Sequence, residues 1–393
     1  MSNAGKNLQT VRKRRGLSQR ELADASGVSL SAIRKLEQGE RPSARMETWR
    51  KLASTLKVPT MSLATPDTEG ADGETVDRWE QVRKALDAPV GLTAEQDEPP
   101  TVDGVRESVD ALTPLFRADQ FGKLAVALPQ IIRDADALGP AGRPVRVKLL
   151  QLTGWLLTQT RQFEAAQSAL ERSMDDVSDR LEATETANNL CWLLLRMGKL
   201  GEARELAIKW ADDMEPRRIT KATPTELCLW GWMLLRVSAA AVRDSRPGEA
   251  EDAMKFAHAA SIALGREYAP PEHSLRTFGP LTVLLKRGEN AAVSDAPDKV
   301  LKFASLVPRK GKRGGVRPTS NNWNRHLLDV SHAHARTGQY GDAVAQLREI
   351  HAASPEWLPN QRFARDILNE VIAGRRTLTT EMRDLAEAVR LPL

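Results

Sequence analysis

The sequence predicts an all-α protein in which a small basic N-terminal domain precedes a long array of helical hairpins. Three observations support this prediction. Beyond residue 105 there is almost no apolar–polar alternation with a period of two, and a six-residue turn signal recurs there. Residues 1–64 carry 13 Lys and Arg against 5 Asp and Glu, whereas the remaining residues carry 44 against 47. A basic head on a weakly acidic body is typical of a nucleic-acid-binding module joined to a second domain.

The composition is that of an ordinary globular protein, with 393 residues, 41% of them hydrophobic and 28% charged. The two cysteines, Cys191 and Cys228, are too few for a disulfide framework or a four-cysteine zinc site. The N-terminus has no apolar segment of the kind found in secretory signals. The longest apolar run, Leu227–Val242, is interrupted by Arg236 and reads as too short to span a bilayer. We therefore expect a cytoplasmic protein without a membrane span.

Residues 6–58 predict short helices separated by tight turns. Ser18 and Glu21 form the pattern of a capping box at the start of the second helix. Gly27 stands where a tight turn requires a positive φ. The expected helices are Leu8–Arg15, Gln19–Ala25, Leu30–Gln38, Met46–Val58 and a short turn at Met61–Leu63.

The stretch Leu17–Gly39, LSQRELADASGVSLSAIRKLEQG, resembles the Xre-like (phage-repressor-type) helix-turn-helix family. The Leu-Ser-Gln start, Glu-Leu-Ala, the Gly-Val-Ser turn and Leu-Glu-x-Gly all fall in register. The resemblance covers roughly residues 5–64. It implies a five-helix, lambda-repressor-like domain whose second motif helix lies in the major groove of double-stranded DNA.

The resemblance also implies roles for individual residues. Lys35 would donate to guanine and Leu30 would contact a thymine methyl group. The family usually has larger polar residues at Leu30 and Ser31, so the operator sequence remains open. Arg12 and Glu37 correspond to an internal ion pair of the family. The complete set of expected DNA contacts is Leu30, Ser31 and Lys35 for bases, and Gln19, Ser29, Arg34, Arg41 and Arg45 for phosphates.

Residues 65–104 read as an acidic linker that contains one short helix, Glu74–Ala88. Val76, Trp79, Val82 and Leu86 fall on one face of that helix. We expect Trp79 to dock the helix on the body. The flanking segments would let the head take up different positions relative to the body.

From residue 105 to residue 393 the chain reads as a helical repeat domain. The last residues of the recurring turn signal are separated by 42, 37, 47 and 93 residues. The longest interval predicts a further unit with a degenerate turn at residues 287–292. The pattern resembles tetratricopeptide repeats, in which stacked helical hairpins form an α-solenoid. Because most of the consensus is missing, we describe the domain as tetratricopeptide-like. Each signal has an aromatic residue, Leu or Pro at its third position, and the signals end at Leu124, Ala166, Ala203, Ala250 and Ala343.

The whole chain resembles bacterial regulators that combine an Xre-like head with a tetratricopeptide-like body. Phe278-Gly-Pro-Leu281 and the segment Arg325–Arg336 support this wider resemblance. It implies a transcriptional regulator that acts as a homodimer on a palindromic operator, while its body dimerises, senses an effector, or both. Whether transcription is repressed or activated remains open.

Peptide receptors of Gram-positive bacteria share this plan, and in them Asn side chains on inner helices bind a peptide backbone. Polar residues on apolar helices of this chain suggest a similar groove. Local capping or pairing of the Asn side chains is the alternative interpretation. A small-molecule effector, a partner protein or no effector also remain open. The candidate groove residues are Asn188, Asn189, Arg196, Arg236, Asn322 and Arg325.

The sequence contains no motif that predicts catalysis, a cofactor or a metal site. There is no Gly-rich phosphate loop, Gly-x-Ser-x-Gly elbow or His-Glu-x-x-His helix. His326 and His332 are six residues apart, which does not place two ligands on one helix face. We therefore predict a protein that is not an enzyme. The alternative to an effector-sensing regulator is a DNA-tethered protein-interaction scaffold with no small effector.

Overall fold

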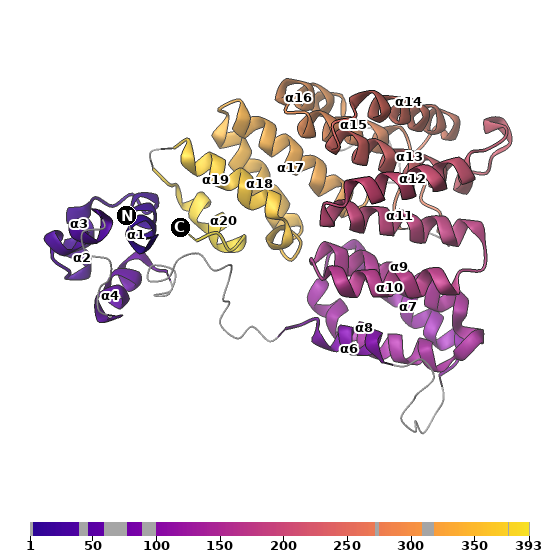
Figure 1. Ribbon diagram of the computed structural model, residues 1–393, viewed down its shortest axis with the longest axis horizontal. Helices are drawn as coiled ribbons and strands as arrows, with labels where there is room; N and C mark the ends of the chain where they lie inside the picture. The colour runs from indigo at the N-terminus through magenta and orange to yellow at the C-terminus, as the bar shows by residue number, and fades with distance from the viewer. Residues whose placement is uncertain are drawn as a thin grey trace. The chain divides into compact units, whose positions relative to one another are not determined.

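The computed structural model describes residues 3–38, 46–58, 77–88, 100–271, 275–308, 318–375 and 377–392. Within these ranges the chain is helical apart from turns, loops and an isolated bridge between Tyr268 and Phe278. The prediction of an all-α protein is therefore confirmed. The chain divides into two compact units, one formed by Met1–Val76 with Gly338–Leu393 and the other by Asp77–Thr337 (Figure 1).

The N-terminal helices follow the sequence prediction closely. The Ser18 hydroxyl accepts a hydrogen bond from the Glu21 amide at 3.1 Å, and the Glu21 carboxylate accepts one from the Ser18 amide at 2.7 Å. This is the predicted capping box. Gly27 ends the second helix with a φ of 67°. The short turn expected at Met61–Leu63 lies outside the described residues. The helices are α1 (Asn3–Arg14), α2 (Gln19–Ser26), α3 (Leu30–Gln38) and α4 (Met46–Leu56).

These four helices enclose a small apolar core of their own. Helix α1 packs on α3, α2 packs on α4, and α2 also contacts α3. Ile33 and Leu36 are three positions apart on the inward side of α3, and both are fully buried. The opposite side of α3 is thereby left toward solvent. The core also contains Trp49, and its fully buried side chains include Leu8, Leu22, Ile33, Leu36, Leu52 and Leu56.

The linker helix belongs to the second unit. It is shorter than expected, α6 (Glu80–Asp87), and it packs against α8 and α10. Trp79 is buried beside Val82 and Leu86, so the expected docking of this helix through Trp79 is confirmed. The Arg83 guanidinium donates to the Gln162 side-chain oxygen at 2.7 Å, which adds a polar contact to the same docking.

The second unit is a stack of helical hairpins (Figure 1). Each helix packs on the next one along the chain, and the odd-numbered helices also pack on one another in a row. This row forms the inner layer of the stack. The helices are α7 (Val102–Arg117), α8 (Phe121–Ala137), α9 (Arg143–Gln159), α10 (Phe163–Asp176), α11 (Arg180–Met197), α12 (Leu200–Met214), α13 (Pro224–Arg243), α14 (Pro247–Leu264), α15 (Pro280–Val293), α16 (Pro297–Leu306) and α17 (Ser320–Arg336).

One backbone geometry recurs in the hairpin turns and explains the repeated sequence signal. In each turn one residue adopts a left-handed conformation, and the amide of the next residue bonds to a carbonyl five positions earlier. The Gln162 amide lies 2.8 Å from the Leu157 oxygen, and the Lys199 amide lies 2.9 Å from the Leu194 oxygen. Bonds of this kind close the last turn of a helix. The left-handed residues are Asp119, Arg161, Gly198, Ser245 and Asp295.

The prediction of a degenerate turn at residues 287–292 is wrong, because these residues lie inside α15. The turn instead contains Asp295, with a φ of 50°, and α16 begins at Pro297. Proline fits the first helical position, where no backbone N–H is needed. Pro247 begins α14 in the same way in a turn that the signal does include, so Pro297 fits the signal, and what differs here is its last position, Val300 instead of Leu or Ala.

The C-terminal segment contains three helices that pack against one another. Trp357 and Leu358 are fully buried in the connection between the first and second of them. The helices are α18 (Tyr340–Ala353), α19 (Arg362–Ala373) and α20 (Thr380–Ala388).

Helix α13 corrects the expectation that its apolar run is too short for a bilayer. Among the described residues it is the helix whose length and composition would suffice for a membrane span, with a mean hydropathy of 1.2. However, 83% of that window is buried inside the protein. A buried apolar helix of this kind is typical of a protein core.

Two glycines of one turn are expected to respond to alanine with opposite signs. Gly198 has a φ of 79°, so Gly198→Ala should lower the free energy of unfolding by about 1 kcal/mol. Gly201 lies in α12 with no atom within 4 Å of an added Cβ, so Gly201→Ala should raise it by roughly 0.5 kcal/mol. Urea unfolding of the two variants provides the measurement. Equal signs would contradict the described turn.

Candidate functional site

One side of α3 is open to solvent within the N-terminal unit. Ser29, Ser31, Arg34 and Lys35 are exposed, whereas Leu30 is partly buried and packs against the core of the helices α1–α4. The Ser29 hydroxyl accepts a hydrogen bond from the Ala32 amide at 3.3 Å and so caps α3. The helix therefore presents its N-terminus and a row of short polar and basic side chains.

A buried ion pair holds α3 in place. Arg12 donates from Nε to Glu37 Oε1 at 2.7 Å and from Nη2 to Glu37 Oε2 at 2.9 Å. The side chains are only 8% and 1% exposed. Arg12 also donates to the Leu17 carbonyl at 2.7 Å. This two-point pair fixes the rotation of α3 relative to α1, which sets the direction of its exposed residues.

One of the expected phosphate contacts, Gln19, already bonds within the protein. Its side-chain Nε2 donates to Glu37 Oε2 at 2.7 Å, so one of the two side-chain N–H groups is used there. The other N–H is the one that remains for a phosphate. Arg41 and Arg45 lie outside the described residues.

The second unit contains a pocket on its inner layer. The pocket comprises about 590 Å³ of space not filled by protein atoms, part of it open solvent, and is bordered by α7, α9, α11, the loop before α15 and the start of α17. Its apolar wall consists of Phe116, Leu152, Trp155, Pro271 and Leu275. Its polar residues are Arg117, Lys148, Gln151, Glu185, Asn189, Arg276, Thr319 and Ser320.

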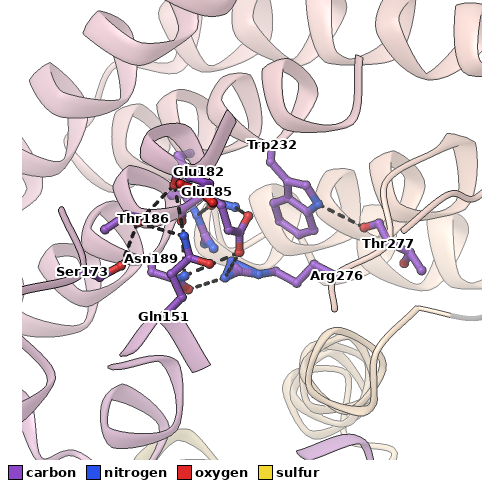
Figure 2. A network of polar contacts seen from close by, with 11 residues as sticks. Gln151, Ser173, Glu182, Glu185, Thr186, Asn189, Trp232, Arg276 and Thr277 are labelled. Carbon is purple, nitrogen blue, oxygen red and sulfur yellow. Dashed lines mark hydrogen bonds and ion pairs between the residues drawn. The ribbon is translucent and has the colours of Figure 1, made fainter. Parts of the chain in front are cut away.

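Glu185 is the centre of the polar network at this pocket (Figure 2). Arg276 donates from Nη2 to Glu185 Oε1 at 2.9 Å and also to the Asn189 side-chain oxygen. Asn189 Nδ2 donates to the Glu185 main-chain oxygen at 3.2 Å. Gln151 donates to the Thr186 hydroxyl at 2.9 Å. These bonds fix the polar residues that form the pocket floor, namely Gln151, Glu185, Asn189 and Arg276.

Trp232 connects the pocket floor to α13. Its indole N–H donates to the Thr277 carbonyl at 3.1 Å (Figure 2), which anchors the loop that carries Arg276. The guanidinium carbons of Arg236 and Arg276 lie 5.3 and 5.9 Å from the Trp232 ring centroid. The negative face of an aromatic ring attracts such cations. Lys286 Nζ lies 5.8 Å from the same centroid, so the ring contacts three positive charges.

Of the six expected groove residues, Asn189 lines the pocket. Asn188 is fully buried, and its oxygen accepts from Arg236 Nε at 2.7 Å. Asn188 and Arg236 are therefore hydrogen-bonded to each other within the inner layer. Arg325 lies over the Trp192 ring at 5.5 Å from its centroid, and Asn322 is 6% exposed on the same helix.

The sequence reading missed several pocket residues. Gln151 and Glu185 do not belong to any motif of the sequence, and Arg276 lies in the loop between α14 and α15. The Phe278-Gly-Pro turn, which begins two residues after Arg276, does not indicate where Arg276 points. Trp155 is partly exposed and lines the pocket.

Burial changes the ionisation of several inner-layer groups. The pKa of Arg196 and that of Arg236 are each lowered to about 9, mainly because burial disfavours the charged form. Burial, together with nearby Glu289, raises the pKa of Asp329 to about 8. Burial also lowers the pKa of His326 to about 4. Within the described ranges, no group of three or more His, Cys, Asp or Glu residues could hold a metal ion.

Comparison with known proteins identifies the N-terminal segment. Residues 8–63 match the helix-turn-helix family model. An uncharacterized HTH-type transcriptional regulator of Bacillus subtilis, RghRB, is 42% identical over 59 residues, which is 15% of this chain and 42% of the relative. The HTH-type transcriptional repressor RghR of the same organism is 39% identical over 59 residues, 44% of its length. The N-terminal region is an Xre-like helix-turn-helix domain.

The chain thus spans less than half the length of these relatives. Among solved structures, Bacillus thuringiensis PlcR in complex with the peptide PapR7 and DNA aligns with 78% of this chain and 95% of its own, at 13% identity and a TM-score of 0.37. The apo form of ComR from S. thermophilus aligns over the same shares at 13% identity and a TM-score of 0.28.

Proposed function

We propose that the protein is a sequence-specific DNA-binding transcriptional regulator whose helical body dimerises, senses an effector, or both. The observation that carries the proposal is the exposed face of α3, which the buried Arg12–Glu37 pair holds in a segment that matches the helix-turn-helix family. The relatives over this segment are named as transcriptional regulators. Residues 1–64 act as the DNA-binding domain, 65–104 as a linker with one helix, and 105–393 as the repeat domain.

In this proposal α3 enters the major groove. Leu30, Ser31 and Lys35 contact base edges, and the phosphates are held by Gln19, Ser29, Arg34, Arg41 and Arg45. A homodimer reads the two halves of a palindrome about one helical turn apart. Such a protein acts in the cytoplasm.

The pocket of the second unit supports effector sensing. It combines an apolar wall with fixed hydrogen-bonding groups, which is the usual composition of a small-ligand or peptide site. A ligand that binds one arrangement of the repeats better than another shifts the population toward it. Asn189 is the expected groove residue that borders this pocket, and its side-chain amide is held there by Glu185 and Arg276.

Replacing Lys35 by alanine tests the DNA contact. Selection of bound genomic fragments by the unaltered protein should yield a palindromic site. On that site Lys35→Ala should cost about 1–3 kcal/mol, with relaxed preference at one base position. Arg34→Ala should instead weaken all sequences alike, and its loss should shrink the salt dependence.

Asp24→Ala, a change of an exposed residue on α2, serves as the control and should bind like the unaltered protein. Fluorescence anisotropy at several salt concentrations measures all of these variants. An affinity that does not fall with salt, or an unchanged site preference in Lys35→Ala, would contradict the assigned role of α3.

A DNA-tethered scaffold is the second candidate. Phe256 and Ile262 of α14 are 55% and 60% exposed, and because they stand six residues apart they lie on different sides of the helix, so a partner would have to contact both sides. In that case Phe256→Ser together with Ile262→Ser should remove a stoichiometric protein partner. DNA affinity would then not depend on any effector.

A further inference from the structure

The inner layer around α11, α13, α15 and α17 holds more positive than negative side chains among the described residues. Two of the cations share one carboxylate, because Arg243 Nη2 and Lys286 Nζ each lie 2.7 Å from Glu289. Each oxygen of Glu289 therefore already accepts from one cation of the protein. The cations of this cluster are Arg196, Arg236, Arg243, Arg276, Lys286 and Arg325, and its carboxylates are Glu185, Glu289 and Asp329.

Asp329 does not balance the remaining charge. Burial raises its pKa to about 8, with a further contribution from Glu289, so the group is mostly protonated at pH 7. Arg236 has a neutral partner, the Asn188 oxygen, rather than a carboxylate. The cluster consequently carries a positive excess in a largely desolvated position, which is costly unless an anion joins it.

Arg196 is the least satisfied member of the cluster. Its Nε and Nη2 atoms are buried and have no hydrogen-bond partner. The charged groups that affect it most are all cations, namely Arg325, Arg161 and Arg243. Arg196 as a whole is partly exposed, whereas these two donor atoms are not. Buried guanidinium donors without acceptors are rare in a finished protein interior.

A second unsatisfied donor lies on the facing helix. Asn322 is 6% exposed, and its Nδ2 is buried without a partner. It precedes Arg325 by three residues on α17, so the two side chains share one face of the helix. Both orphaned groups are donors, which favours an acceptor-rich ligand.

A row of aromatic rings joins this cluster to the pocket. Phe116 lies 6.0 Å from Trp155, and Trp155 lies 6.5 Å from Trp192, measured between ring centroids. Arg325 continues the row by lying over Trp192 at 5.5 Å. Arg196 follows Trp192 by four residues and so lies on the same face of α11. Trp155 borders the pocket, and the row leads from it through Trp192, which is 6% exposed, toward the cations.

From these observations we infer that the effector carries an oxyanion, a carboxylate or phosphate, which binds at Arg196 between α11 and α17 while its apolar part lies along the Phe116–Trp155–Trp192 row. The inference rests on the proposed effector-sensing function and names the chemistry of the ligand. A bidentate guanidinium–oxyanion contact supplies the acceptors that Arg196 Nε and Nη2 lack.

Thermal unfolding of the full chain tests the inference. The probes are inorganic phosphate, citrate, and the tripeptide Trp-Leu-Leu with either a free or an amidated C-terminus, all at constant ionic strength set with NaCl. We expect a saturable rise of the Tm with at least one oxyanion. A response to the free tripeptide and not to the amide indicates a peptide carboxylate. A response to phosphate or citrate alone indicates a small anionic effector.

Arg196→Met separates this site from the basic DNA-binding head. The variant should lose the response, with anion affinity at least tenfold weaker. Because it removes a buried charge without a partner, it should also raise the Tm of the free protein. Arg196→Lys, which keeps a cation, should retain part of the response. Arg106→Met, on the exposed surface of α7, and Lys35→Ala should both respond like the unaltered chain.

The inference is overturned if no probe raises the Tm, or if Arg196→Met responds as the unaltered chain does. A lower Tm of Arg196→Met with an unchanged response would assign Arg196 a purely structural role and would equally overturn it. Operator binding by the free protein is measured in parallel. Its loss in the unaltered chain contradicts the proposed function, whereas an absent anion response with intact operator binding contradicts the oxyanion site alone.

Discussion

Glu37→Ala is expected to unfold the N-terminal helices and abolish DNA binding while Asp77–Thr337 stays folded. The change leaves the Arg12 guanidinium buried without its carboxylate and also removes the acceptor of the Gln19 amide. Breaking a buried pair by removing one partner costs about 3–5 kcal/mol. That is a large share of the stability of so small a domain. Differential scanning calorimetry should show the loss of one transition, and limited proteolysis should locate it to residues 3–58.

Two further variants test the reason for this effect. Asp24→Ala alters an exposed carboxylate of the same domain and should change its stability by less than about 0.5 kcal/mol. Arg12→Met combined with Glu37→Met removes both charges and should regain most of the stability, since an apolar pair of similar volume replaces the ion pair. If Glu37→Ala melted like the unaltered protein, the pair would not be what holds α3.

Glu185→Ala is expected to have the largest effect on the second unit. Glu185 accepts hydrogen bonds from Arg276 at 2.9 Å and from Asn188 at 3.3 Å, and Arg276 is 7% exposed. Without this carboxylate a buried guanidinium loses its counter-charge, so the free energy of unfolding should fall by about 3–5 kcal/mol. Urea unfolding followed by far-UV circular dichroism measures the change.

The matched control is Glu205→Ala on α12, an exposed glutamate whose removal should alter stability by less than about 0.5 kcal/mol. Glu185→Gln keeps hydrogen-bonding atoms of nearly the same shape and loses only the charge, so it should fall between the two. A loss below about 1 kcal/mol in Glu185→Ala would show that the neighbouring amides can hold Arg276 without Glu185.

The described helices α1–α4 could be predicted because their signals are local. A capping box, a glycine with positive φ and the spacing of Ile33 and Leu36 define α2, the turn and α3 within about twenty residues. The repeated hairpin turns were predictable for the same reason, apart from the turn at Asp295. There, Val300 stands where the other signals end in Leu or Ala, so the pattern does not mark the turn.

The amino-acid order alone determined the helical class, the motif that exposes one side of α3, and the succession of hairpins, because helix periodicity and caps depend on residues a few positions apart. Only the tertiary structure decided which polar side chains meet. Glu185 and Arg276 are 91 residues apart, and Trp192 meets Arg325 across an even longer stretch of chain. Such encounters depend on how the hairpins stack, and stacking is set by the summed packing of many side chains rather than by any short pattern.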